Sequence, residues 1–78
     1  MKTYVFRVQL EEEEDGRWSV WIDALPGCAA WGYTKEEALE AIQDAAEAYV
    51  EDLLETGEKV PDGEAEGSIP PLVTVAVA

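Results

Sequence analysis

Carboxylates are the most abundant side chains in this sequence that could bind a metal or transfer a proton. Five consecutive acidic residues run from Glu11 to Asp15. Four more recur at helical spacing, namely Glu40, Asp44, Glu47 and Glu51. The run lacks the spaced oxygen ligands and central glycine of a calcium loop, and a metal on the helical stripe needs further carboxylates from a second element. We expect no metal and no other cofactor, and we interpret both groups as solvated or partner-facing surfaces, with a divalent-metal site as the alternative.

The usual nucleophile and base chemistry is missing. The sequence contains no histidine, which excludes Ser–His and Cys–His pairs and an imidazole base. Its single cysteine, Cys28, follows a glycine instead of opening a helix, and no cation is placed to activate it. We interpret Cys28 as a small buried apolar residue, with a reactive thiol as the alternative. We therefore expect that the protein is not an enzyme.

Charge restricts the class of partner. The 78 residues carry 18 acidic and 5 basic side chains, a formal net charge of −13. Nucleic acids and anionic membranes are excluded as direct partners because both require clustered Lys and Arg. A basic protein is the natural complement. No apolar stretch approaches the roughly 20 residues of a membrane span, and no signal peptide is recognisable, so we expect a cytoplasmic protein.

Hydrophobic periodicity predicts the elements that position these groups. Alternating apolar residues predict strands over 2–10, 17–24 and 72–78, and a shorter strand over 28–32. The tip of the first hairpin is expected at Glu11 to Asp15, where Asp15-Gly16 signals a turn. A capping box formed by Thr34 and Glu37 opens a helix predicted over 35–55, and Gly57 is its expected C-terminal cap.

These elements predict a single domain over residues 1–78. The order β-β-β-α-β indicates an α+β fold, with a single layer of antiparallel sheet and one long helix packed on one face. The polar segment 59–71 is expected to be a loop that wraps over the sheet edge. Trp18 is predicted to fill the core under the helix and Tyr49 to pack beneath it.

The middle of the sequence resembles the HicB-type antitoxins. Leu25-Pro26-Gly27-Cys28 follows the second predicted strand, and Thr34-Lys35-Glu36-Glu37-Ala38 opens the long helix after Gly32. Gly57, Val60 and Pro61 are similar to the exit from that helix in the family. The residues that carry the motif are Leu25, Pro26, Gly27, Cys28, Gly32, Thr34, Glu37 and Ala38. The resemblance covers residues 2–61, and reaches the last strand by analogy.

The resemblance implies a partial ribonuclease-H-like fold and a role in protein binding. Its members neutralise a small basic HicA-type toxin, an mRNA-cleaving enzyme, by covering its RNA-binding and active site. Many members carry a further C-terminal DNA-binding domain; this chain ends at Ala78 without a basic region, so a short form is expected. The alternative is a self-assembling regulatory or structural protein of the same fold with no toxin partner. A homodimer or tetramer is expected for the free protein.

Candidate partner-binding residues follow from charge and from the strand alternation. They are Glu11, Glu12, Glu13, Glu14, Asp15, Trp21, Trp31 and Tyr33. The alternation places Trp21 and Trp31 on the sheet face away from the helix, where either a homodimer interface or a toxin contact would use them. Pro26 and Gly27 are interpreted as turn residues, with direct partner contact as the alternative.

Overall fold

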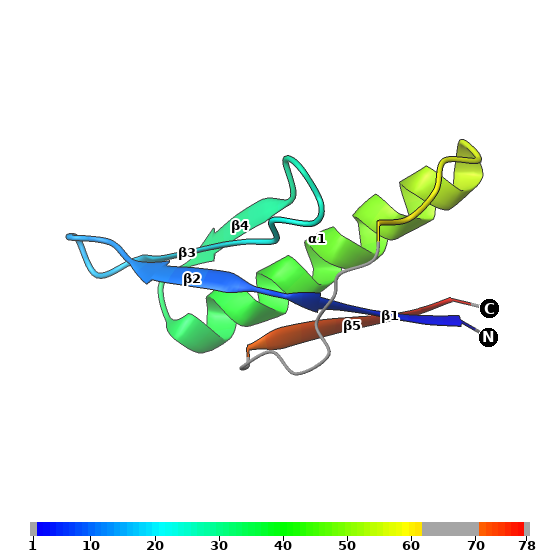
Figure 1. Cartoon of the computed structure of the whole chain (residues 1–78). Coiled ribbons are helices and arrows are strands. Elements are labelled where there is room, and N and C mark those ends of the chain that lie inside the picture. The colour runs from blue at the N-terminus through cyan, green and yellow to red at the C-terminus, as the bar shows by residue number, and fades with distance from the viewer. Residues whose placement is uncertain (1, 62–70, 78) are drawn as a thin grey trace.

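A computed structural model describes residues 2–61 and 71–77 and confirms the α+β class. Its elements are β1 (Lys2–Arg7), β2 (Gln9–Glu12), β3 (Trp18–Trp21), β4 (Ala29–Gly32), α1 (Lys35–Glu55) and β5 (Leu72–Val77). All strand pairs are antiparallel, and one long helix lies across one side of the strands (Figure 1). In the described ranges, no helix is long and apolar enough to cross a membrane.

The first predicted strand changes its pairing partner at Val8. β1 pairs with β5, whereas β2 pairs with β3, which pairs with β4. The Val8 amide donates to the Pro71 carbonyl at 3.1 Å, and the next residue, Gln9, lies opposite Trp21 of β3. Neighbouring strand residues direct their amides to opposite edges, so β5 lies along one edge of this strand and β3 along the other. The strand predicted over 2–10 is therefore corrected to two strands that run end to end (Figure 1).

The core lies between the strands and α1. Phe6 comes from β1, Val8 from the junction of β1 and β2, Val20 from β3, and Val73 and Val75 from β5; all are buried. The facing helix residues are buried as well, at the spacing of one helix stripe: Ala38, Ile42, Ala46 and Val50. Trp18, predicted to fill this core, is half-buried and packs against it.

Both ends of α1 are fixed by local signals, and its predicted bounds are confirmed. The Glu37 amide donates to the Thr34 hydroxyl at 3.1 Å, and the Glu37 carboxylate accepts the Tyr33 amide at 3.0 Å. At the other end, Gly57 has φ +78° and the Glu58 amide donates to the Leu53 carbonyl at 2.9 Å, which is a Schellman motif.

Thr34→Ala is expected to lower the free energy of unfolding by about 1 kcal/mol, because the Glu37 amide loses its acceptor at the first turn. Urea unfolding followed by tryptophan fluorescence measures the change. Thr34→Ser keeps the hydroxyl and is the control, expected within about 0.5 kcal/mol of the original chain. Equal losses for both variants would contradict the capping role.

The second and third predicted strands are shorter than expected. β3 ends at Trp21 instead of Ala24, because the Leu25 amide donates to the Ile22 carbonyl at 3.1 Å and turns the chain. β4 begins one residue after Cys28. The last strand is found as predicted up to Val77. Of the predicted loop 59–71, residues 62–70 lie outside the described residues, and Val60 is buried.

The acidic run is divided between a strand and a turn. Glu11 and Glu12 belong to β2, opposite Ser19 and Trp18, which corrects the predicted hairpin tip to Glu13–Gly16. The Glu13 amide donates to the Arg17 carbonyl at 2.7 Å and closes the turn. Carboxylates fit a strand here because both side chains are exposed to solvent.

Candidate partner-binding site

The face of the β2-β3-β4 sheet opposite α1 carries three of the candidate residues, Glu11, Trp21 and Trp31, in two rows. Glu11, Ser19 and Trp31 lie side by side in one row. Gln9, Trp21 and Ala29 form the next. Because the core-facing residues alternate with these, the prediction that Trp21 and Trp31 lie away from the helix is confirmed. Trp31 is 51% exposed, and Trp21 is half-buried.

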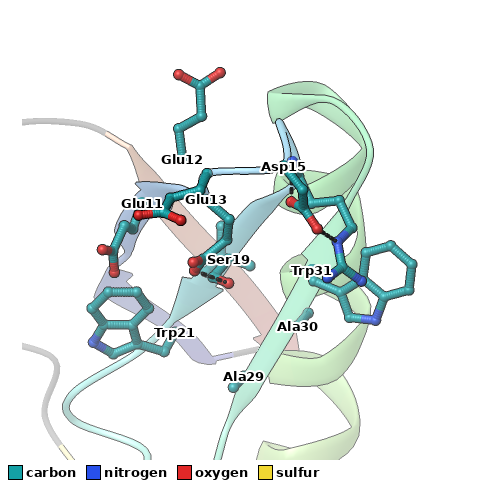
Figure 2. Close-up of a pocket in the computed structure, with 12 residues that line it drawn as sticks. Glu11, Glu12, Glu13, Asp15, Ser19, Trp21, Ala29, Ala30 and Trp31 are labelled. Carbon is teal, nitrogen blue, oxygen red and sulfur yellow. Dashed lines mark hydrogen bonds and ion pairs between the residues drawn. The ribbon is translucent and has the colours of Figure 1, made fainter.

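An open groove of about 870 Å³ occupies this face. Its lining includes the whole acidic run, Arg17, Ser19, Trp21 and Trp31, together with Ala29 and Ala30 of β4 (Figure 2). In Figure 2 the carboxylates of Glu11 and Glu13 lie toward Trp21 and Ser19, whereas Glu12 points away from them. The groove therefore combines five carboxylates, one guanidinium and two indole rings.

The hairpin tip is attached to the indole of Trp31 through Arg17. The Asp15 carboxylate accepts the Arg17 amide at 3.0 Å and the Arg17 Nε at 2.7 Å. The guanidinium lies 5.5 Å from the Trp31 ring centre, a cation–π distance, and Tyr33 packs edge-on against Trp31 with 5.1 Å between ring centres. The hydrogen bond from the Arg17 amide is the largest cause that lowers the pKa of Asp15, and the hydrogen bond from the guanidinium lowers it further. Asp15 thus stays ionised while it orients Arg17.

Ser19 holds a second carboxylate in place. Its hydroxyl donates to Glu13 Oε1 at 2.8 Å across the β2-β3 hairpin. The groove thus has two acidic groups of restricted geometry, Glu13 and Asp15, beside the more freely exposed Glu11 and Glu14. Oriented charges next to an apolar wall are suited to binding the cationic side chains of a protein.

Sequence reasoning missed Arg17 and Ser19 as groove residues. Strand alternation places Ser19 on the same face as Trp21, so that signal was present in the pattern. The stacking of Arg17 on Trp31 depends on the register between β3 and β4, which the sequence does not display.

The motif residues form the joint between sheet and helix and not the groove. Gly27 has φ +84° in the turn, and the Pro26 carbonyl accepts the Tyr49 hydroxyl at 2.7 Å, which ties that turn to α1. Leu25 is fully buried, as is Ala38 at the start of the helix. These contacts favour the interpretation of Pro26 and Gly27 as turn residues. Tyr49 is half-buried and packs against the core.

Cys28 lies in the core, 5% exposed, and burial raises the pKa of its thiol. The Cys28 amide donates to the Leu25 carbonyl at 2.9 Å, so the residue also closes the turn. This environment agrees with the structural interpretation and not with an activated thiol. No group of three or more metal-ligating side chains occurs within residues 2–61 and 71–77.

Iodoacetamide is expected to alkylate Cys28 of the folded protein at least about 100-fold more slowly than Cys28 of the urea-unfolded chain, because the thiol is both buried and protonated. The fold should also become less stable above about pH 9, where the unfolded thiol releases its proton and the folded thiol retains it. Cys28→Ala removes this contribution and is the control. Equal alkylation rates would contradict the burial of the thiol.

Comparisons with known proteins find a matching family model and several similar proteins. A family model described as HicB_like antitoxin of bacterial toxin-antitoxin system matches residues 6–69. A UPF0150 protein of Thermoplasma acidophilum is 44% identical over 61 residues, which are 78% of this chain and 88% of that protein. A UPF0150 protein of a Synechocystis strain is 40% identical over 58 residues, 74% of this chain and 73% of that protein.

Two solved structures share the fold. The N-terminal domain of the antitoxin HicB from Burkholderia pseudomallei gives a TM-score of 0.70 at 22% identity, over 99% of both chains. The longer structure of that antitoxin gives a TM-score of 0.68 at 23% identity and covers 99% of this chain. This chain spans 64% of the longer one.

Proposed function

Because the chain belongs to the HicB-like antitoxin family, we propose that it neutralises a small basic HicA-type toxin, an mRNA-cleaving enzyme, by covering the toxin's RNA-binding surface and active site. The observation that carries this proposal is the groove in which Trp21 and Trp31 lie among five carboxylates. The protein acts by binding and not as an enzyme, needs no cofactor, and works in the cytoplasm, where mRNA is cleaved.

The mechanism is competition for a positive surface. An enzyme that binds RNA presents Lys and Arg side chains that neutralise the phosphates of the RNA. The carboxylates of the hairpin occupy the position of the phosphates. The two indole rings supply the apolar contact that turns electrostatic attraction into a stable complex, since buried aromatic side chains dominate the affinity of most interfaces.

The roles of the candidate residues follow from the groove. Glu13 and Asp15 are oriented acidic contacts, because Ser19 and Arg17 hold them. The remaining acidic candidates, Glu11, Glu12 and Glu14, add steering charge. Trp31 is the exposed aromatic contact, and Tyr33, 70% exposed, lies at its rim.

A native pull-down of the tagged protein from its source cells tests the proposal. We expect a small basic protein at near-equal stoichiometry when washes are at low salt, with less recovered as salt rises. The purified partner should cleave mRNA, and equimolar addition of this chain should stop the cleavage. A partner that binds but has no ribonuclease activity, or one whose activity persists in the complex, would overturn the proposal.

The self-assembling alternative has its own structural support. Leu72, Thr74 and Ala76 of β5 and Val5 of β1 are exposed, and none of them lines the acidic groove. A homodimer or tetramer of the free protein is compatible with either function.

A further inference from the structure

The β1–β5 ribbon, defined as Lys2–Arg7 and Leu72–Val77, differs in charge from the rest of the molecule. It contains none of the 18 acidic residues and two of the 5 basic ones, Lys2 and Arg7. It also carries two of the exposed large apolar side chains, Val5 and Leu72, at 36% and 40% exposure. In Figure 1 the ribbon leads away from the β2-β3-β4 sheet and ends at the two chain termini.

The register shows which backbone groups of β5 are turned away from β1. The Val8 amide bonds to the Pro71 carbonyl, so Phe6–Val73 and Tyr4–Val75 are the hydrogen-bonded pairs of the antiparallel ladder. The residues between them direct their amides and carbonyls to the outer edge of β5: Leu72, Thr74 and Ala76. All three are exposed.

Within the described residues, a single side chain occupies this outer edge. Gln43 of α1 donates from Nε2 to the Thr74 carbonyl at 2.7 Å and to Glu47 Oε1 at 3.1 Å. Both contacts are made by the same amide nitrogen, which settles the orientation of the Gln43 amide. The hydrogen bonds of the described residues leave the amide of Thr74 and the polar groups of Leu72 and Ala76 available.

We propose that the outer edge of β5 pairs antiparallel with β5 of a second copy of this chain, about a two-fold axis at Thr74. This register opposes Leu72 with Ala76 of the partner copy, and it uses all three outward-facing residues of each strand. The two ribbons then form a four-stranded sheet. The packing of Phe6, Val73 and Val75 against α1 stabilises the ribbon in the free chain, and its outer edge remains a site to which an extended strand can add by backbone hydrogen bonds.

Charge selects a second copy as the occupant of this edge. A basic partner is drawn to the acidic groove and not to a ribbon whose only charges are Lys2 and Arg7. A second copy with a charge of −13 is repelled by every acidic surface, and the ribbon is where that repulsion is weakest. The same argument separates the two interfaces: a homodimer through Trp21 and Trp31 would place acidic hairpins against each other.

The pairing gives Gln43 a role as a competitor. Its amide holds the Thr74 carbonyl that the partner strand would take, which makes the edge less accessible in the free chain. Gln43→Ala is therefore expected to tighten the dimer about fivefold. A dimer that is unchanged or weakened by Gln43→Ala would contradict the competition and this register.

Sedimentation equilibrium of the full chain tests the interface. We expect a concentration-dependent shift from the 8.6 kDa monomer toward twice that mass, and a tighter dimer at about 0.5 M salt than at low salt, because salt screens the repulsion. The complex with a basic partner should weaken under the same change. The opposite salt dependences mean that the dimer proposal and the proposed function can be contradicted independently of each other. A monomer at all concentrations and salts would overturn the proposal.

Matched variants locate the contact. Thr74→Glu places two like charges opposite each other at the axis and should weaken the dimer at least about tenfold. Ala48→Glu adds the same charge on the exposed side of α1 and should leave most of the association intact. Thr74→Lys should also weaken the dimer although it makes the chain less acidic. Circular dichroism checks that each variant is folded, and equal effects of Thr74→Glu and Ala48→Glu would place the interface elsewhere.

Discussion

Reversing two charges of the groove, in the double variant Glu11→Lys and Glu13→Lys, is expected to weaken binding of the basic partner by about 100-fold or more. The association rate should fall about tenfold because the steering field is reduced, and the remainder arises from like charges brought into contact. Glu13 contributes most because Ser19 holds its carboxylate in one position. Binding kinetics at several salt concentrations separate the two contributions.

The control for this variant is the double change Glu40→Lys and Asp44→Lys on α1. Both pairs are exposed and change the net charge of the chain by the same amount. If the position of the charges matters, the association rate of the helix variant should fall only by the part that comes from long-range electrostatic attraction. Equal losses in the two variants would mean that overall charge, and not the groove, drives binding.

Trp31→Ala in the same assay is expected to raise the dissociation rate with little effect on association.

Gly32→Ala is expected to lower the free energy of unfolding by about 3 kcal/mol, at the upper end of the cost of overpacking. A β-carbon at this position would lie 2.5 Å from the Ala38 backbone nitrogen and 2.9 Å from the Glu37 carbonyl carbon. Those atoms belong to the first turn of α1, so relief requires β4 and the helix to separate. Urea unfolding measures the loss of free energy, and the melting temperature should fall by roughly 12–24 °C for a domain of this size.

Gly16→Ala provides the contrasting case. Gly16 has φ +90° at the hairpin tip, and a β-carbon there meets no atom within 4 Å. The expected cost is therefore only backbone strain, about 1 kcal/mol. If the two alanine variants are equally destabilised, the close approach of β4 to α1 does not explain the glycine of the motif.

The helix could be predicted to the residue because its limits are encoded locally. The hydroxyl of Thr34, the carboxylate of Glu37 and the conformational freedom of Gly57 act within a few positions of the ends they define. Alternation likewise placed Trp21 and Trp31 on the outer face, because a strand repeats every two residues wherever it lies.

What could not be predicted depends on contacts between distant segments. Alternation continues through Val8, so nothing in the local pattern marks the change of partner from β5 to β3. Glu11 and Glu12 were expected in a turn because acidic runs rarely form strands, yet pairing with Ser19 and Trp18 holds them in one. The bond from Gln43 to Thr74 joins residues 31 positions apart and has no local signal.

The pairing of the first strand with the last has a consequence for synthesis. Lys2 pairs with Val77, so β1 finds its neighbour only after all the elements between them in the sequence have been made. Until then Phe6 has no β5 to pair with across the ladder, and the nascent chain carries an unfinished apolar strand. Meanwhile the β2-β3-β4 meander and α1 assemble from shorter-range contacts. We therefore expect the acidic hairpin, whose contacts are local, to form before the ribbon, whose strands are distant in sequence.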